Sequence, residues 1–192
     1  KIKNIPLIVT FRQPPDKAVE SKLKRIGFKV KYHFSFINGI SGKVPSACFD
    51  SLKSIVEIKK LYFDGKAILM GGTGSSTKVE IIPALNVSQL TGKGICAAFI
   101  DSGVYPHPDL VKPRNRIAAF KDFINDLEYP YDDHGHGTAC IGAAFGASPE
   151  GEFKAPAYDS TIVCAKAFNN LGLGSYSDIL AAMQWIYTIK EK

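Results

Sequence analysis

Hydrophobic and polar positions follow two different patterns along the chain. In the first 70 residues, short β-branched and aromatic runs alternate with two stretches in which apolar residues recur at helical spacing. The expected strands are residues 5–11, 28–37, 40–44 and 56–63, and the expected helices are residues 18–26 and 46–52. Asn38-Gly39, between two of these strands, is a strong hairpin signal. The resulting β-α-β-β-α-β order predicts a small ferredoxin-like α+β domain.

A second pattern begins near Gly94. Residues 94–100 form one continuous apolar run, which is typical of a parallel strand that is buried on both faces. Further strands are expected at residues 117–123 and 160–168, and helices at residues 135–145 and 177–189. Because strands and helices alternate, this part is expected to be an α/β domain with a parallel sheet. The glycine- and serine-rich stretch 71–77 reads as the linker between the two parts.

Charge divides the chain at the same place as the hydrophobic pattern. Residues 1–70 carry 14 Lys/Arg and 5 Asp/Glu, a net charge of +9, whereas residues 71–192 carry 10 and 13, a net charge of −3. Opposite charges suggest two modules that face each other, although a basic domain with a solvated surface would look the same. A basic module also permits nucleic-acid binding, but the expected central strands lack the Lys/Arg-Gly-Phe block of an RNA-binding sheet.

Composition also limits the setting in which the protein works. No apolar run reaches the roughly 18 residues that a membrane span needs, and the first residues show no signal peptide. The four cysteines form no CxxC pair, so we expect buried thiols rather than a disulfide framework. This cysteine usage fits a secreted protein and an intracellular one; the expected location is secreted or at the cell surface, and an intracellular location is the alternative.

Two residues stand where chemistry is expected. Asp101 ends the buried apolar run, and reactive groups of open α/β sheets gather at the carboxyl ends of strands. His136 lies between two glycines at the start of an expected helix that is rich in small residues. An aspartate can hold the tautomer of an imidazole and stabilise its charged form during proton transfer. The pattern therefore predicts a general base at His136, while Asp101 alone would fit a structural turn as well.

Three other readings compete for these motifs. His134, His136 and Cys140 could ligate a metal together with Asp132 or Asp133, although their spacing matches no standard zinc frame. Residues 71–77 resemble a phosphate loop, but no glycine precedes the lysine that follows them. Residues 172–175 supply only two of the three glycines of a dinucleotide fingerprint.

Several motifs together resemble the subtilisin-like serine proteases. They are Phe99-Ile100-Asp101-Ser102-Gly103-Val104, His107-Pro108-Asp109-Leu110, Gly135-His136-Gly137-Thr138 and Gly172-Leu173-Gly174-Ser175-Tyr176. The resemblance extends from Gly94 to Trp185 and implies the N-terminal half of a parallel-sheet subtilisin-like catalytic domain. It implies a polypeptide substrate, with Asp101 orienting the general base His136.

The same resemblance assigns binding roles to a later segment. Gly172, Leu173 and Gly174 would form the edge strand on which an extended substrate peptide pairs, which is the mode called β-augmentation. Tyr176 would wall an apolar subsite. Neither a nucleic acid nor a membrane is implied as a partner.

The first module resembles the propeptide of the family, which acts as a folding catalyst and an inhibitor. The resemblance divides the chain into a propeptide domain, residues 1–70, and a catalytic part, residues 71–192. Cleavage is expected between Met70 and Gly71, after the apolar tail 67–70. The basic charge of the first module against the acidic second one agrees with a docking role.

The chain departs from the family pattern in three ways. Ala139 replaces a second histidine that is not catalytic in the family. Asp109 matches a frequent calcium ligand, but the loop 142–156 lacks the asparagine-rich segment that supplies the other ligands, so no certain cofactor follows. The block that carries the catalytic serine is absent. The expected function is an autoprocessing endopeptidase zymogen whose serine lies in a C-terminal half outside this chain, and the alternative is an inactive relative that binds peptides.

Overall fold

The computed structural model describes residues 3–70, 90–151 and 153–190, which pack as two compact units. Unit 1 contains Lys1–Ala67 together with Ser175–Lys192, and unit 2 contains Ile68–Gly174. No helix within the described ranges is long and apolar enough to cross a bilayer. The units follow packing, whereas the division into residues 1–70 and 71–192 concerns processing and stays a prediction.

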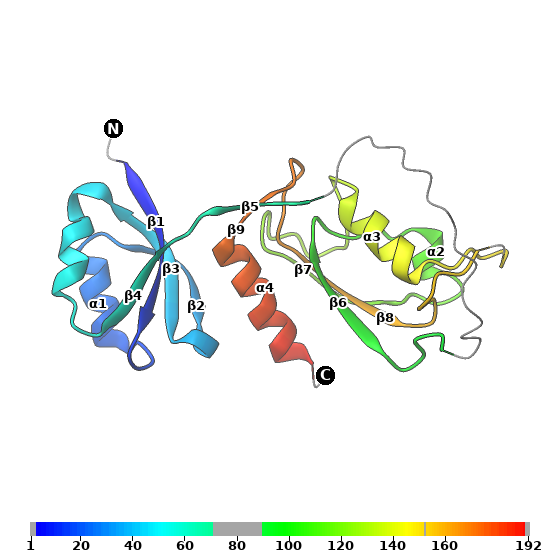
Figure 1. Cartoon of the computed structure of the whole chain (residues 1–192), viewed down its shortest axis with the longest axis horizontal. Coiled ribbons are helices and arrows are strands. Elements are labelled where there is room, and N and C mark those ends of the chain that lie inside the picture. The colour runs from blue at the N-terminus through cyan, green and yellow to red at the C-terminus, as the bar shows by residue number, and fades with distance from the viewer. Residues whose placement is uncertain (1–2, 71–89, 152, 191–192) are drawn as a thin grey trace. The chain divides into compact units, whose positions relative to one another are not determined.

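Unit 1 is built on a four-stranded antiparallel sheet (Figure 1). Its elements before the linker are β1 (Asn4–Phe11), α1 (Lys17–Arg25), β2 (Lys29–Phe34), η1 (Ser35–Ile37), β3 (Gly39–Pro45), η2 (Ser46–Ser54) and β4 (Ile58–Phe63). The strand order β2-β3-β1-β4 is that of a ferredoxin-like sheet. The core between the sheet, α1 and η2 is apolar; its members include Leu7, Val9, Phe11, Leu23, Ile40, Val44 and Leu52.

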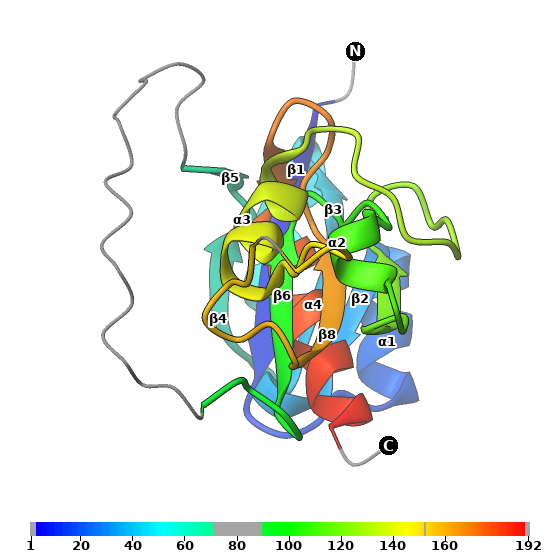
Figure 2. The same ribbon diagram turned by 90° about the vertical axis from the view of Figure 1, so that its right-hand side faces the viewer.

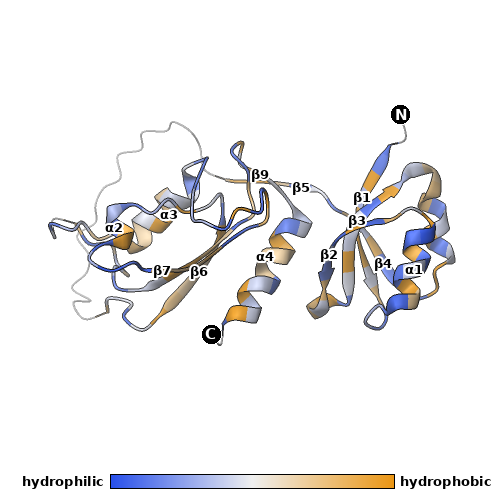
Figure 3. Cartoon of the chain, turned by 180° about the vertical axis from the view of Figure 1, so that it is seen from behind, coloured by the Kyte–Doolittle hydropathy of each residue, from blue (hydrophilic) through white to orange (hydrophobic). Residues whose placement is uncertain are grey.

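Local signals explain where α1 begins and ends. The Asp16 side chain accepts a hydrogen bond from the Val19 amide at 2.8 Å, which satisfies one of the free amides of the first turn. Gly27 then adopts a left-handed φ of 77°, a conformation that a glycine takes without strain. Hydrophilic and hydrophobic bands alternate along α1, as expected for a helix with one face on a sheet (Figure 3).

Two elements of unit 1 differ from the sequence prediction. The strand expected over residues 28–37 ends at Phe34, because the next three residues form the 3₁₀ turn η1 and Asn38 is left-handed with φ 47°. The helix expected over residues 46–52 is the 3₁₀ helix η2, which has no side-chain cap at Pro45. Segments as short as these carry little periodicity from which the helix type could be recognised.

Helix α4 (Tyr176–Ile189) packs against β2 within unit 1. Its N-terminus is a capping box, in which Ser175 and Asp178 bond each other's backbone amides. The Asp178 carboxylate also accepts hydrogen bonds from Lys31 Nζ at 2.7 Å and Tyr32 Oη at 2.9 Å. The same carboxylate therefore both starts the helix and holds it to the sheet.

Unit 2 centres on a three-stranded parallel sheet of order β6-β8-β7, with α2 and α3 on one face (Figures 1 and 2). Its elements are β6 (Cys96–Asp101), α2 (Pro108–Val111), β7 (Ile117–Asp122), α3 (His136–Phe145) and β8 (Thr161–Lys166). The α/β fold with a parallel sheet, predicted from the apolar runs, is confirmed. The predicted burial of residues 94–100 on both faces is wrong, because β6 is the outer strand of the described sheet and Asp101 is its one buried residue. The prediction of buried thiols holds for Cys164 but is wrong for Cys96, which is exposed. Asp101 pairs with Lys166, so both residues stand at the carboxyl edge of the sheet.

Two short strands, β5 (Lys66–Ile68) and β9 (Leu173–Ser175), form a separate two-stranded sheet. Within unit 2, the pairing continues beyond β5, because the Leu69 amide donates to the Gly172 carbonyl at 2.9 Å. The segment that ends at Met70 is therefore extended along residues 172–174.

Candidate active site

Asp101 is placed by the strand that carries it. It is the last residue of β6 and is only 8% exposed, and its carboxylate accepts a hydrogen bond from the Ser102 amide at 2.6 Å. The strand that carries it, β6, pairs in parallel with β8 along its whole length, which fixes the backbone at this edge. A charged carboxylate in so buried a position needs partners.

His136 is the first residue of α3, directly after Gly135, which has a left-handed φ of 93°. Gly137 lets this helix start come close to the turn after β6. A Cβ atom on Gly137 would lie 2.1 Å from the Gly103 carbonyl oxygen, so any side chain there would push the helix away. Gly137 therefore serves the close approach of α3 to Asp101, whereas Gly135 supplies the left-handed backbone before the helix and has open space where a Cβ would lie.

The structure brings Asp101 and His136 together. His136 Nδ1 lies 2.8 Å from Oδ1 and 3.0 Å from Oδ2 of Asp101. The hydrogen bond to Asp101 raises the pKa of His136, and partial burial of the ring opposes this shift. With Nδ1 engaged by the carboxylate, Nε2 is the nitrogen free to exchange a proton with a reacting group.

A second carboxylate organises the loop before His136. Asp132 accepts hydrogen bonds from the Gly135 amide at 2.8 Å, from the Thr138 amide at 2.8 Å and from the Thr138 hydroxyl at 2.6 Å. It also accepts from the Ser102 hydroxyl at 2.9 Å, and that hydroxyl in turn accepts from the Gly137 amide. Burial alone would raise the pKa of Asp132, but these hydrogen bonds outweigh it and lower the pKa to about 2.

Lys166 holds the turn after Asp101 through hydrogen bonds of its ammonium group. The residue is fully buried, and its Nζ donates to the Ser102 carbonyl at 2.5 Å, the Asp133 carboxylate at 2.6 Å and the Phe168 carbonyl at 2.8 Å. All three ammonium protons are thereby used. The sequence analysis named Ser102 only within a family motif and Asp132 only as an alternative metal ligand, so their supporting roles were not predicted. Lys166 was missed altogether, although a lysine at the end of an apolar strand was a signal for it.

The predicted cleavage segment also reaches His136. The Met70 carbonyl oxygen lies 3.3 Å from His136 Nε2. Gly172 pairs with the residue before Met70, and Leu173 and Gly174 follow it in β9. Gly71, the other predicted cleavage residue, lies outside the described residues. Tyr176 belongs to unit 1, where its ring lies beside Gly65, so its subsite role stays a prediction.

The ligands proposed for a metal from the sequence are only partly brought together. Within the described ranges, one group of three ligand-type residues has its atoms within 4.8 Å of one another, and it consists of Asp101, His136 and Cys140. His134 is not in that group, and Asp132 is occupied by the donors of its own loop. Burial, followed by the charges of Asp101 and Asp132, raises the pKa of Cys140.

Asp109, the predicted calcium ligand, has few suitable neighbours. Its carboxylate faces His107 Nδ1 at 3.4 Å. Calcium takes six to eight oxygen ligands, and the described residues place no group of three ligand-type side chains around Asp109. The expectation from the sequence, that Asp109 does not make calcium a certain cofactor, therefore stays a prediction.

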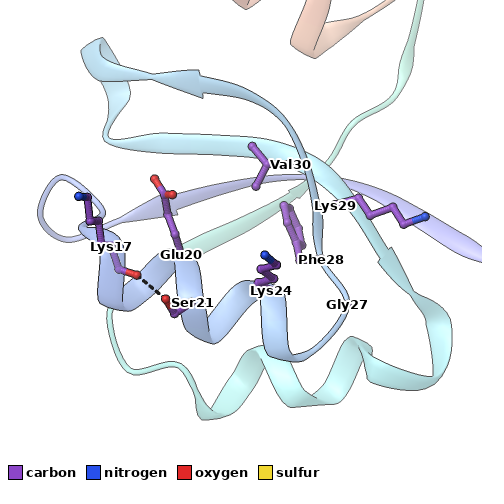
Figure 4. Close-up of a pocket in the computed structure, with 8 residues that line it drawn as sticks. All are labelled: Lys17, Glu20, Ser21, Lys24, Gly27, Phe28, Lys29 and Val30. Atoms are coloured by element: carbon purple, nitrogen blue, oxygen red, sulfur yellow. Dashed lines mark hydrogen bonds between the residues drawn. The ribbon is translucent and has the colours of Figure 1, made fainter.

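Two hollows formed by described residues are lined by neither Asp101 nor His136. A groove of about 760 Å³ in unit 1 lies between α1 and the start of β2, and it is lined by lysines and by Phe28 (Figure 4). Glu20 lies among these lysines, and none of the predicted site residues lines the groove. In unit 2, a smaller hollow of about 420 Å³ is lined by residues that include His107, Asp109 and Asp132.

Comparison with known proteins identifies relatives. Serine protease AprX of Bacillus subtilis is 39% identical over 168 residues, which cover 85% of this chain and 37% of AprX. M-protease of Shouchella clausii is 24% identical over 172 residues, which cover 88% of this chain and 44% of that protein. The chain thus spans less than half the length of these relatives.

Solved structures show the same fold. Fervidolysin of Fervidobacterium pennivorans, a keratinolytic enzyme related to subtilisin, matches 97% of this chain and 34% of its own with a TM-score of 0.72 at 17% identity. The epidermin leader peptide processing serine protease of Staphylococcus aureus also matches 97% of this chain, and 48% of its own, with a TM-score of 0.72 at 14% identity. The model of the subtilase family, Peptidase S8, matches residues 92–192, and by this match over more than half of its length the chain belongs to the subtilase family.

Proposed function

We propose that this chain supplies the aspartate and the histidine of a serine endopeptidase, and that its own Met70–Gly71 bond is the first bond to be cleaved. The serine that completes the triad lies outside these 192 residues. One observation carries the proposal: His136 has Nδ1 on the Asp101 carboxylate and Nε2 3.3 Å from the Met70 carbonyl oxygen. The histidine thus connects the orienting carboxylate with the predicted cleavage point.

The chemistry follows from the two ring nitrogens. Asp101 holds the proton on Nδ1, so that the lone pair of Nε2 can accept the proton of the serine hydroxyl as this oxygen attacks the peptide carbonyl. The imidazolium then gives that proton to the leaving amine, and an acyl-enzyme remains for hydrolysis by water. Hydrogen bonding to Asp101 raises the pKa of His136, which favours the imidazolium that forms during attack.

The path of the chain before Met70 supports the same function. Leu69 donates its amide to the Gly172 carbonyl, which is how an extended peptide adds a strand to the edge of a binding site. We infer that polypeptide substrates pair with residues 172–174 in the same way. A propeptide that stays on this edge after cleavage would compete with substrate and so act as an inhibitor.

The test is intact mass and N-terminal sequencing of the full-length protein, beside His136→Ala and His33→Ala variants. His33 is an exposed histidine of unit 1 that pairs with Glu20, so it is a matched control. We expect a new N-terminus at Gly71 in the wild type and in His33→Ala, and an uncut chain in His136→Ala. An uncut wild type with its serine present would instead indicate an inactive relative that binds peptides.

A further inference from the structure

His134 is an exposed histidine two residues before His136, and no step of the proposed reaction uses it. The two imidazole rings lie edge to face, with their centroids 6.2 Å apart. The Asp132 carboxylate accepts a hydrogen bond from the His134 amide at 3.1 Å, which holds the backbone that carries the ring. Among the described residues, none forms a hydrogen bond with the His134 ring itself.

The His134 ring reaches the edge on which the predicted cleavage segment pairs. A Cβ atom placed on Gly172 would lie 3.1 Å from His134 Nε2 and 3.6 Å from the Cβ atom of Leu69. Gly172 has a left-handed φ of 68°, which favours a glycine, and the missing side chain leaves this space open. The ring nitrogen and the Leu69 side chain therefore lie on the same side of Gly172.

The place of Leu69 identifies the substrate residue that meets the ring. Met70 supplies the carbonyl beside His136 Nε2, so Leu69 stands one residue before the one whose carbonyl is attacked in the proposed function. The hydrogen bond from the Leu69 amide to the Gly172 carbonyl, at 2.9 Å, fixes this register. A substrate side chain in the same register lies beside His134 Nε2, to which leucine offers no hydrogen-bonding group.

The charges around His134 favour a proton on Nε2. The Asp132 carboxylate bonds the His134 amide, and Asp133 precedes His134 directly, so the loop that carries the ring is acidic. Both carboxylates have donors of their own, Asp132 from its loop and Asp133 from Lys166. A ring N–H that faces a substrate side chain selects an acceptor, and a carboxylate forms the stronger, charge-assisted hydrogen bond.

We propose that His134 selects the substrate side chain one position before the cleaved residue, and that it favours the carboxylate of aspartate or glutamate over an apolar or a basic side chain. This inference deepens the proposed function: selection among substrates rests on that function, whereas the contact between the ring and residue 69 does not. Because Leu69 makes only apolar contact there, the chain's own segment lacks the hydrogen bond that a preferred substrate forms.

Hydrolysis of a matched peptide series by the full-length protein tests the selection. The peptides carry Ala-Ile-X-Met before the cleaved bond, where X is leucine, glutamine, glutamate or lysine. We expect kcat/KM for glutamate to exceed that for glutamine about three- to fivefold, because the two side chains have the same shape and one is charged. His134→Asn should abolish this ratio. His107→Asn is the matched control and should keep it, because His107 is exposed on unit 2 and lines a hollow without His136.

Amide hydrogen exchange provides a second measurement that needs no hydrolysis. The full-length chain is kept uncut by replacing its serine with alanine, and Leu69→Glu is compared with Leu69→Gln. The amide of residue 69 bonds to the Gly172 carbonyl, so its exchange reports how firmly the segment is held. We expect the ratio of the two exchange rates to change about three- to fivefold when His134→Asn is added. This comparison cancels the intrinsic difference between glutamate and glutamine.

Two results overturn the inference: glutamate-to-glutamine ratios that His134→Asn leaves unchanged, or a preference for lysine over glutamate. Exchange that depends on His134, in a protein that hydrolyses no peptide, supports the contact and refutes the protease. Hydrolysis whose ratios do not depend on His134 supports the protease and refutes the selection. Thermal unfolding of each variant shows that it is folded.

Discussion

Replacing Lys166 by methionine tests how the edge of the parallel sheet is held. Methionine keeps most of the volume of the lysine stem, so the change removes the ammonium group without leaving a large cavity. The Ser102 and Phe168 carbonyls then lose a donor in a place with no access to water, since Lys166 is fully buried. Each unsatisfied buried group costs about 1–3 kcal/mol.

Burying the charge of Lys166 itself lowers the stability of the folded state, because the ammonium group loses its hydration. Removing the charge therefore recovers part of this free energy. Replacing a buried ion pair is often neutral when both partners become apolar. Here, however, two of the three partners are backbone carbonyls, which stay in place and stay buried. Asp133 is 36% exposed on its side chain and can be hydrated instead. The cost of leaving the two carbonyls without a donor therefore exceeds the gain from removing the buried charge. We expect Lys166→Met to lower the free energy of unfolding by about 2–5 kcal/mol.

Unfolding of the full-length protein in guanidinium chloride, monitored by a signal that reports on unit 2, measures this loss of stability. Lys121→Met is the matched control, because Lys121 lies on β7 of the same sheet and is exposed. Its effect should stay within about 0.5 kcal/mol. If Lys166→Met is as small as this control, the three hydrogen bonds of the ammonium group contribute nothing to stability and the reasoning fails.

Three further predictions concern Asp101, Ser102 and Asp132. Asp101→Asn should lower kcat of the full-length protease about 10⁴-fold, because the amide favours the wrong tautomer of His136; a steady-state rate near that of wild type would contradict it. Ser102→Ala leaves the buried Gly137 amide unpaired and should cost about 1–3 kcal/mol in thermal unfolding, and an unchanged Tm would disprove this. Asp132 has a folded pKa of about 2 against 3.8 when unfolded, so its contribution is complete above pH 4 and is lost as pH falls towards 2. After allowance for its partial exposure the loss is about 1–2 kcal/mol, and an Asp132→Asn variant should lack this part of the acid-induced drop in Tm.

The sequence predicts most of the scaffold because burial leaves a periodic trace. Continuous apolar runs marked the parallel strands, and the run that ends in Asp101 also placed this carboxylate at the edge of the sheet. The glycines around His136 indicated a close approach, and the structure shows that it occurs at Gly137, against the Gly103 carbonyl. What the sequence could not predict rests on contacts between distant residues, such as the bonds of Ser102 to Asp132 and of Lys166 to Phe168.

Short elements escaped prediction for a related reason. The strands β5 and β9 have three residues each, which is too few for an alternating pattern to be recognised, so β5 was missed and an edge strand at residues 172–174 was expected from the family resemblance alone. The sequence identified α4 by its period but gave no sign that it packs on β2, because a helix shows which face is apolar and not which sheet will cover that face. Polar contacts such as that of Gln184 with the Ser35 amide decide this.

The double role of Asp178 couples the formation of α4 to its docking. A 14-residue helix is marginal in water by itself, and here the carboxylate that closes its capping box is shared with Lys31 and Tyr32 of β2. When β2 unfolds, α4 loses the strand on which it packs. At the same time the Asp178 carboxylate of its capping box loses the hydrogen bonds from Lys31 and Tyr32. We therefore expect the amide protons of α4 and β2 to exchange with solvent as one cooperative block, with no state in which the helix persists after the strand has opened.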